Sequence, residues 1–307
     1  EIAVKLGYIK KGGLLYKIWN ILTEISLKNA DKIIVLSEDM KTGLLNLIKS
    51  IDEAKIEVIH NWANEEVMKL ISKEENYFLD KFGIKNKFII EYSGNMGRIH
   101  EFNTLLRAAK ELKNEKDILF LFIGNGGKKL DIQKYVEEND LDNVMFLPYQ
   151  ERKNLAYSLG MADVHILSLQ EDYIHLSAPS KLYGILASGK PILFIGGSSC
   201  YIAKLIKMFQ CGFQVNINDY QKVVKLILNI KFDTNLKRFL GNNSVKLFRE
   251  NYSLSIISQK YKKLLVNSLM DIHSNTINTR FINTVNSVKT SFHDINLEKD
   301  VINEEQR

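Results

Sequence analysis

The stretch from Ala178 to Gly197 reads APSKLYGILASGKPILFIGG, and its pattern is the strongest indication of an α/β fold in this chain. It opens with Pro-Ser-Lys, continues as a helix of small and apolar residues, turns at Gly189 and ends in the apolar strand ILFI. A strand end, a helix start and a lysine that meet at one loop are how α/β proteins hold a phosphate group. A second loop of this kind, YSGNMGR at 92–98, lies upstream. Two such loops in one sheet indicate a nucleotide ligand.

Outward from this stretch, short apolar segments alternate with amphipathic ones. The run ILFLFI at 118–123 is continuously apolar, which is typical of a parallel strand buried on both faces. Six strands that alternate with helices predict a doubly wound parallel sheet with right-handed crossovers. The expected strands are 88–92, 118–123, 144–147, 164–169, 192–195 and 213–215, and the expected helices between them are 101–113, 129–138, 152–160, 180–188 and 199–209.

The segments on either side of this region are less regular. Residues 12–28 form an amphipathic pattern, whose apolar face we expect to pack against a core. We interpret 64–87 as a charged connection with one short helix, and 267–307 as a poorly ordered tail rich in polar residues. The other expected elements are strands at 32–36 and 55–59, and helices at 38–49, 219–229, 234–248 and 253–265.

The bulk composition narrows the classes of function. The chain has 307 residues, a formal net charge of +6 and a pI of about 9.0, which fits a phosphorylated ligand or an anionic membrane surface. Lys and Arg are not clustered with aromatic residues, so we expect no nucleic-acid partner. Two cysteines are too few for a disulfide framework, and no apolar run is long enough to span a membrane. We therefore expect a cytoplasmic protein.

The acidic residues and histidines show no metal-binding pattern at the expected ligand edge. The six histidines are scattered along the chain. Asp140-Leu141-Asp142 resembles the Asp-x-Asp of some metal sites, but it precedes a strand and so falls at the opposite edge of the sheet. We expect no metal and no cofactor.

The carboxyl ends of the strands are where ligands bind in such a sheet, and this rule selects the candidate residues. After the strand at 88–92, Gly94 and Gly97 allow tight turns, and the free amides of the loop together with Arg98 would bind a diphosphate. Asn95 belongs to the same loop, and His100 opens the next helix, where it would add a hydrogen-bond donor. The alternatives are a glycine turn that only packs and a histidine exposed to solvent.

Two further loops follow the next strands. Gly124, Asn125 and Gly126 come after 118–123 and suit a loop that lies against a nucleotide, although a simple β–α turn is the alternative. Pro148 comes after the third strand, where backbone groups would border a base unless the turn is merely buried.

Ser180 and Lys181 stand at a helix start directly after a proline. A lysine there adds positive charge where the helix dipole is already positive, which is locally unfavourable unless an anion lies opposite. A surface lysine without a ligand is the alternative. Tyr183 is one turn inside the same helix and completes the set of candidate binding residues.

Four segments occur in an order that resembles a known family: SGNMGRIHEFNTLLRAA, FIGNGG, ADVHILSL and APSKLYGILASGKPILFIG. They look like the nucleotide-binding half of a glycosyltransferase family 4 ("group 1") enzyme with the GT-B fold. The nearest subgroup builds bacterial surface polysaccharides such as O-antigen, capsule or colanic-acid-type polymers. ADKIIVLSEDM and KIEVIHNW resemble the closing segments of its acceptor-side domain, so the resemblance covers roughly residues 1–265.

The resemblance implies an α/β GT-B fold of two Rossmann-like, doubly wound domains that face a cleft, the first of them incomplete. Residues 1–86 would be the C-terminal part of the acceptor-side domain with its linker, and 87–250 the domain that binds the nucleotide-sugar donor. Residues 251–266 would be a helix crossing back to the first domain, followed by the tail.

The family's activity is the retaining, metal-independent transfer of a sugar from a nucleotide-sugar, here expected to be UDP-linked, to a lipid-linked or glycan acceptor. Arg98 and Lys181 match the positions where cations hold the donor diphosphate, whose charge grows as the sugar leaves. For the helix at 12–28, with Lys10 and Lys11 before it, a peripheral contact with the inner face of the cell membrane is the alternative to core packing.

The sequence departs from the family in two ways. The Glu-x7-Glu pair of the broader family falls on Leu176 and Gly184, so the usual ribose-binding glutamate cannot be carried over. The chain begins at Glu1, near the last third of an acceptor domain, so we expect a fragment. Two other functions stay open: a nucleotide-sugar 2-epimerase of the same fold, which would need an acid–base pair, and a donor-binding module without turnover.

Overall fold

The computed structural model describes residues 1–270. The chain divides into two compact units, Glu1–Ser258 and Gln259–Arg307. Residues 254–258 begin a helix in the first unit, and residues 259–270 are helical in the second. Residues 267–270, expected to belong to the tail, are therefore helical, and the rest of the expected tail lies outside the described residues.

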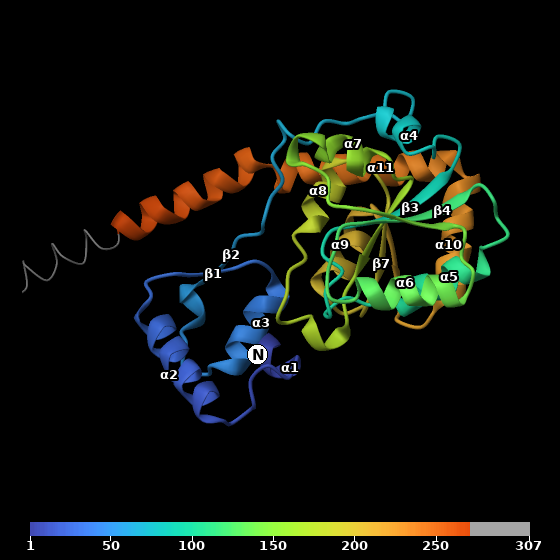
Figure 1. Cartoon of the computed structure of the whole chain (residues 1–307). Coiled ribbons are helices and arrows are strands. Elements are labelled where there is room, and N and C mark those ends of the chain that lie inside the picture. Colours follow the sequence, from blue (N-terminus) through green and yellow to red (C-terminus); the bar gives the residue numbers. More distant parts are fainter. Residues whose placement is uncertain (271–307) are drawn as a thin grey trace, which may run out of the picture. The chain divides into compact units, whose positions relative to one another are not determined.

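The centre of the first unit is a six-stranded parallel sheet in the order β5-β4-β3-β6-β7-β8. The chain builds outward from β3 through β4 to β5, and then returns to the other side of β3 with β6 (Figure 1). The point where the winding reverses therefore lies between β3 and β6, and ligands bind at such a point. The doubly wound parallel sheet is confirmed. Its strands are β3 Phe88–Ser93, β4 Ile118–Ile123, β5 Val144–Leu147, β6 Val164–Ser168, β7 Ile192–Ile195 and β8 Gly212–Val215.

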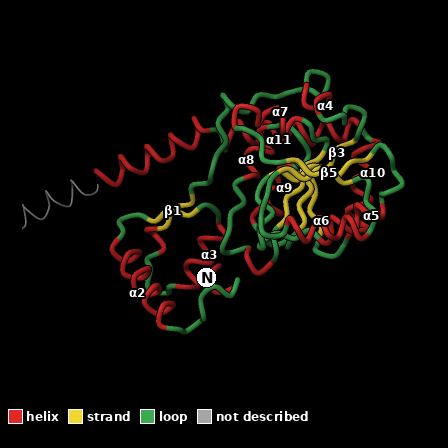
Figure 2. The backbone as a smooth tube through the Cα atoms, viewed as in Figure 1, coloured by secondary structure: helices red, strands yellow, loops and turns green. Residues whose placement is uncertain are grey.

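Helices cover both faces of this sheet, which is why its strands are mostly apolar. Ile90 and Tyr92 join a core with α5 and α10, whereas Ile89 joins a second core with Phe78 of α4. Figure 2 shows the strands enclosed between the helical layers. The helices are α4 Tyr77–Lys81, α5 Asn103–Glu111, α6 Lys129–Glu138, α7 Leu155–Gly160, α8 Lys181–Ala187, α9 Tyr201–Phe209, α10 Tyr220–Phe232 and α11 Thr234–Asn251.

Polar side chains fix where several of these helices begin. The carboxylates of Asp219 and Asp233 accept hydrogen bonds from the backbone amides of Lys222 and Leu236, which caps α10 and α11. The segment expected as one helix over 152–160 is split into a short 3-10 turn, η2 Arg152–Asn154, followed by α7. The other 3-10 turns are η1 Glu53–Lys55 and η3 Glu171–Tyr173.

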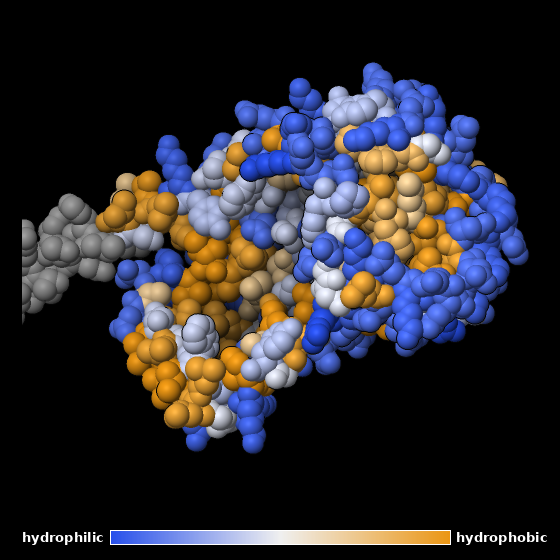
Figure 3. Space-filling model, in the orientation of Figure 1, coloured by the Kyte–Doolittle hydropathy of each residue, from blue (hydrophilic) through white to orange (hydrophobic). Residues whose placement is uncertain are grey.

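The N-terminal segment carries a small separate sheet of two parallel strands. Ile33, Val35, Ile51 and Ile56 form its core. No residue of α2 is buried, and Leu14 is 77% exposed, so the expectation that its apolar face packs against a core is wrong for the described structure. Figure 3 shows apolar residues gathered over this segment. Its elements are α1 Ile2–Lys5, α2 Leu14–Asn29, β1 Ile33–Val35, α3 Glu38–Leu47 and β2 Ile56–Val58.

Candidate functional site

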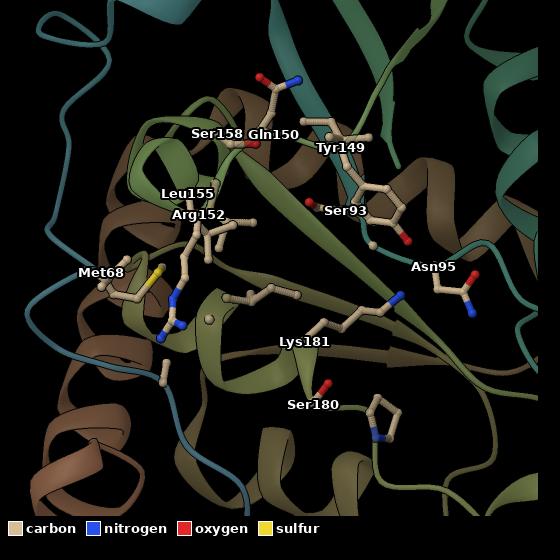
Figure 4. A pocket seen from close by; sticks show the side chains of 18 of the residues that line it. Met68, Ser93, Asn95, Tyr149, Gln150, Arg152, Leu155, Ser158, Ser180 and Lys181 are labelled. Carbon is tan, nitrogen blue, oxygen red and sulfur yellow. The ribbon is translucent and has the colours of Figure 1, made fainter. Parts of the chain in front are cut away.

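A cavity of about 600 Å³ opens at the carboxyl edge of the six-stranded sheet, where the winding reverses. Its wall combines the loop after β3, the loop after β5, α7, the start of α8 and the linker around Met68. Figure 4 shows Lys181, Asn95 and Tyr149 on one side of this space and Arg152 with Met68 on the other. The volume suits a drug-sized or nucleotide-sized ligand.

Lys181 borders the cavity at the first turn of α8. Its Nζ donates a hydrogen bond of 2.5 Å to the hydroxyl of Tyr92 and lies 3.8 Å from the centre of that ring. Burial lowers the pKa of Lys181 to about 7. Within residues 1–270 no carboxylate forms an ion pair with it, so the site holds a largely buried ammonium with no opposite charge beside it. A bound anion would supply that balance.

The glycine loops after β3 and β4 pack closely against one another. The amide of Met96 donates to the carbonyl of Asn125 over 2.7 Å, and the amide of Lys128 donates to the carbonyl of Met96 over 2.9 Å. Gly124 has φ +128°, and a Cβ placed on it would lie 2.2 Å from the carbonyl oxygen of Gly94. Glycine at 124 is therefore required for the close approach of the two loops.

His100 borders the cavity as a neutral group. Its Nδ1 lies 2.6 Å from the backbone carbonyl oxygen of Ser168, which can only accept, so Nδ1 carries the proton. Burial and the nearby Lys181 lower the pKa of His100 to about 4. At neutral pH the His100 imidazole is therefore uncharged and can form hydrogen bonds. It is buried, so the alternative of a histidine exposed to solvent is wrong.

The structure brings five of the predicted residues to the cavity wall, and these are Gly94, Asn95, His100, Ser180 and Lys181. The others lie elsewhere. The Arg98 guanidinium lies 6.0 Å from the centre of the Tyr8 ring, and Tyr183 is buried under α8 with its ring 5.1 Å from Tyr252. The remaining predicted residues outside the wall are Gly97, Gly124, Asn125, Gly126 and Pro148. A direct ligand contact by these residues stays a prediction.

Sequence reasoning missed Arg152, which enters the cavity from η2. Its signal was available, because η2 comes after the loop 148–151 at the carboxyl end of β5 and so satisfies the same edge rule. It also missed Met68 of the linker, since the linker's path across the sheet is not encoded in a local pattern.

The described part of the chain has no group of three or more His, Cys, Asp or Glu residues that could hold a metal ion. Asp142 of the Asp-x-Asp pattern forms an ion pair of 2.8 Å with Lys116 before β5 begins. The absence of a metal and a cofactor from the reaction remains a prediction.

The chain is an α/β protein with a cavity at the switch point of a doubly wound parallel sheet, the place where such sheets bind ligands. Residues 74–247 match the family described as Glycosyl transferases group 1. This match covers more than half of the chain, and the chain belongs to this family of glycosyltransferases.

Two curated relatives carry related names. The chain is 28% identical over 264 residues to "Probable glycosyltransferase WbjE" of Pseudomonas aeruginosa, covering 85% of this chain and 64% of the relative. It is 25% identical over 201 residues to "Putative colanic acid biosynthesis glycosyl transferase WcaI" of Escherichia coli strain K12, covering 65% and 49%. The chain thus spans less than two thirds of the length of either relative.

Solved structures share the fold. A structure of Anabaena Alr3699/HepE in complex with UDP and glucose gives a TM-score of 0.69 at 14% identity, covering 80% of this chain and 66% of that one. WaaG, a glycosyltransferase involved in lipopolysaccharide biosynthesis, gives 0.66 at 13% identity, covering 81% and 67%. The GT-B class expected from the resemblance is confirmed.

Proposed function

We propose that this protein transfers a sugar from a UDP-sugar to a glycan or lipid-linked acceptor during the synthesis of a bacterial surface polysaccharide. The observation that carries the proposal is Lys181, a buried cation at the switch-point cavity whose pKa burial lowers to about 7. Family membership and the names of WbjE and WcaI support sugar transfer. HepE has been solved with UDP-glucose, which supports a UDP-linked donor.

In this proposal the donor diphosphate lies against both Lys181 and the loop that holds Gly94, because the two are adjacent at the cavity wall. When the bond between the sugar carbon and the diphosphate oxygen breaks, negative charge grows on the leaving diphosphate. A fixed ammonium in a half-buried site stabilises that charge more than water would. Arg98 would supply a second cation by turning away from Tyr8 toward the diphosphate.

The transfer is proposed to need no metal, since Lys181 and Arg98 would provide the positive charge that the leaving group requires. Retention of the anomeric configuration is proposed from the membership of the chain in the group 1 family. Neutral His100 would then position a sugar or phosphate group through a hydrogen bond. Ser180 and Asn95 lie on the same wall and offer further polar contacts.

The experiment is a transfer assay. The protein is incubated with radiolabelled UDP-sugars and with lipid-linked acceptors extracted from bacterial membranes, and labelled glycolipid and released UDP are measured. Transfer by the wild type that is lost in Lys181→Met supports the proposal. UDP binding without transfer to any acceptor would leave a donor-binding module, and formation of a 2-epimer without acceptor would identify an epimerase.

We also propose that α2 contacts an anionic membrane surface, which would place the protein beside a lipid-linked acceptor. Along α2, Leu14, Trp19 and Leu22 are 77%, 66% and 56% exposed. Lys10, Lys11 and Lys17 lie next to this apolar face in the sequence. Basic amphipathic helices bind in the headgroup region of such membranes. No helix among residues 1–270 is long and apolar enough to cross a membrane.

Co-sedimentation with vesicles tests this contact. We expect the wild type to pellet with phosphatidylglycerol vesicles and Trp19→Ser to stay in the supernatant. Phe232→Ser is the matched control, because Phe232 is 74% exposed and belongs to α10, not to the N-terminal segment. Equal binding of all three proteins would remove α2 from the proposal.

A further inference from the structure

The backbone carbonyl of His100 accepts hydrogen bonds from two side chains that come from different loops. Lys128, which precedes α6, donates through Nζ over 2.7 Å, and Gln170, which follows β6, donates through Nε2 over 3.2 Å. The backbone amide of Gln170 also donates to the carbonyl of Ile99 over 3.0 Å. Together with the 2.6 Å bond between His100 Nδ1 and the Ser168 carbonyl, these contacts fix both the backbone and the ring of His100 at the cavity wall.

The ammonium of Lys128 is committed to this contact. Lys128 is half-buried, and burial lowers its pKa, against the weaker opposing effects of Glu101 and Asp131. Among residues 1–270 no carboxylate forms an ion pair with it, and the bond to the His100 carbonyl is the one hydrogen bond that its ammonium makes. Partial burial of a cation without a paired carboxylate is unfavourable. The interaction with His100 therefore determines where the Lys128 side chain lies.

The proton on Nδ1 of His100 determines what the other ring nitrogen can do. Because Nδ1 donates to Ser168 and the ring is neutral, Nε2 has a lone pair and can only accept a hydrogen bond. Nε2 has no hydrogen-bond partner in the described part of the chain. The diphosphate of a nucleotide-sugar is fully ionised at neutral pH and has no hydrogen to donate, whereas a sugar hydroxyl can donate. His100 is therefore suited to a hydroxyl and not to a phosphate oxygen.

The donor sugar is the part of the ligand that we expect to reach this nitrogen. The charge of Lys181 contributes to the low pKa of His100, so the imidazole lies close to the ammonium that is proposed to hold the diphosphate. The donor sugar is attached directly to that diphosphate and carries several hydroxyls.

We propose that Lys128 and Gln170 are positioning residues, which hold His100 so that its Nε2 accepts a hydrogen bond from a hydroxyl of the donor sugar. This inference rests on the proposed use of a nucleotide-sugar and adds the residues that orient His100 against its sugar.

The test is calorimetric titration with UDP and with UDP-glucose, UDP-galactose and UDP-N-acetylglucosamine, and the UDP-sugar that the wild type binds most tightly is used for every variant. We expect Lys128→Met to weaken binding of this UDP-sugar about 3- to 10-fold, as the loss of a neutral hydrogen bond would give, and to leave UDP binding unchanged. His100→Phe, which keeps an aromatic ring without its nitrogens, should show the same pattern. Adding Lys128→Met to His100→Phe should cause no further loss, because Lys128 acts through His100.

Lys129→Met is the matched control. Lys129 is the next residue along the chain, and its Nζ lies 3.4 Å from the carbonyl oxygen of Gly124 and not at His100, so this variant should bind both ligands as the wild type does. Gln170→Leu changes no charge and should repeat the selective loss of the UDP-sugar. Lys128→Arg keeps a cationic donor and should restore much of the sugar-dependent affinity. A circular dichroism melt checks that each variant is folded.

Two results would overturn the inference. The first is an equal loss of UDP and UDP-sugar binding in Lys128→Met and Gln170→Leu, which would mean that these residues only maintain the fold or the charge of the site. The second is a loss in the double variant equal to the sum of the two single losses, which would mean that Lys128 does not act through His100. Failure of the wild type to bind UDP and every UDP-sugar would instead refute the proposed function.

Discussion

The ammonium of Lys181 donates a 2.5 Å hydrogen bond to the hydroxyl of Tyr92, and it lies over the face of the same ring. Tyr92 projects from β3 and Lys181 from the start of α8, the helix between β6 and β7, so this contact joins β3 to the helix on the other side of the reversal point. The lysine is held in place before any ligand binds, and its charge is only partly compensated. This relationship leads to the first two predictions.

Replacing Lys181 with methionine should weaken ligand binding and at the same time stabilise the fold. We expect Lys181→Met to weaken UDP binding at least about 100-fold, because it removes a charged contact to the diphosphate. We also expect its melting temperature to rise by a few degrees, because it removes a buried cation. This increase in melting temperature should be largest below about pH 7, the pKa of Lys181 in the folded protein. It should shrink as the pH approaches 10.5, the pKa of the lysine in the unfolded chain, because above that pH the lysine is neutral in both states. A lower melting temperature at neutral pH would contradict this account.

The affinity for UDP should depend on pH through the same group. Burial lowers the pKa of Lys181 to about 7 in the free protein, and a bound diphosphate would raise it. UDP binding is then accompanied by proton uptake near neutral pH, and it weakens as the pH rises above 7. Calorimetry in buffers of different ionisation enthalpy measures the proton uptake directly. A pH-independent affinity between pH 6 and 9, with no proton uptake, would exclude a contact between Lys181 and the phosphates.

Glu91 should be a source of instability. It is fully buried on β3, in register with His165 of β6, and both of its carboxylate oxygens lack a hydrogen-bond partner. Burial raises its pKa well above 4.5, against the weaker opposing effect of Lys190, while burial lowers the pKa of His165 to about 3 and keeps it neutral.

We therefore expect Glu91→Gln to stabilise the fold by about 1–3 kcal/mol at pH 7. The unfolded chain loses the Glu91 proton near pH 4.5 and the folded chain only at higher pH, so wild-type stability falls as pH rises through this window. The difference between the two proteins should thus disappear near pH 4. Urea denaturation across pH measures it, and a constant difference would mean that titration of Glu91 is not its cause.

Gly124 should be intolerant of a side chain. Its φ of +128° is unfavourable for any other residue, and a Cβ would meet the Gly94 carbonyl oxygen at 2.2 Å. We expect Gly124→Ala to cost about 1–3 kcal/mol from backbone strain alone and to weaken UDP binding by displacing the loop after β3. Gly83→Ala is the control, since Gly83 has φ +69° with no atom within 4 Å of its Cβ position, so it should cost less and leave binding unchanged. Equal effects of both substitutions on stability and UDP binding would show that the close packing of the two loops contributes to neither.

Much of the six-stranded sheet and its covering helices was predictable because its signals are local. Apolar runs such as ILFLFI and the helical periods between them reflect burial on both faces of a parallel sheet, and all six strands were confirmed. The carboxyl-edge rule also selected Gly94, His100 and Lys181 correctly as residues that line the cavity, because the ends of parallel strands share one edge.

The same rule could not tell which residues of a loop face a ligand and which face a neighbouring loop. Gly124 and Gly126 look like ligand-binding glycines in the sequence, but in the structure they allow the loop after β4 to pack on the loop after β3. Arg98 follows Gly97 in the loop after β3, and its guanidinium lies beside Tyr8, a residue far away in the sequence.

Hydrophobic periodicity and turn residues act over short distances along the chain. They were therefore enough to predict the fold class, the order of strands and helices, and the edge of the sheet that carries the cationic side chains. The tertiary structure alone decided that Lys181 and Tyr92 meet, that Glu91 is buried without a partner, that Arg152 enters the cavity and that α2 is exposed. Each of these depends on contacts, or on their absence, between segments distant in sequence, and desolvation and charge balance are set by the environment that those contacts create.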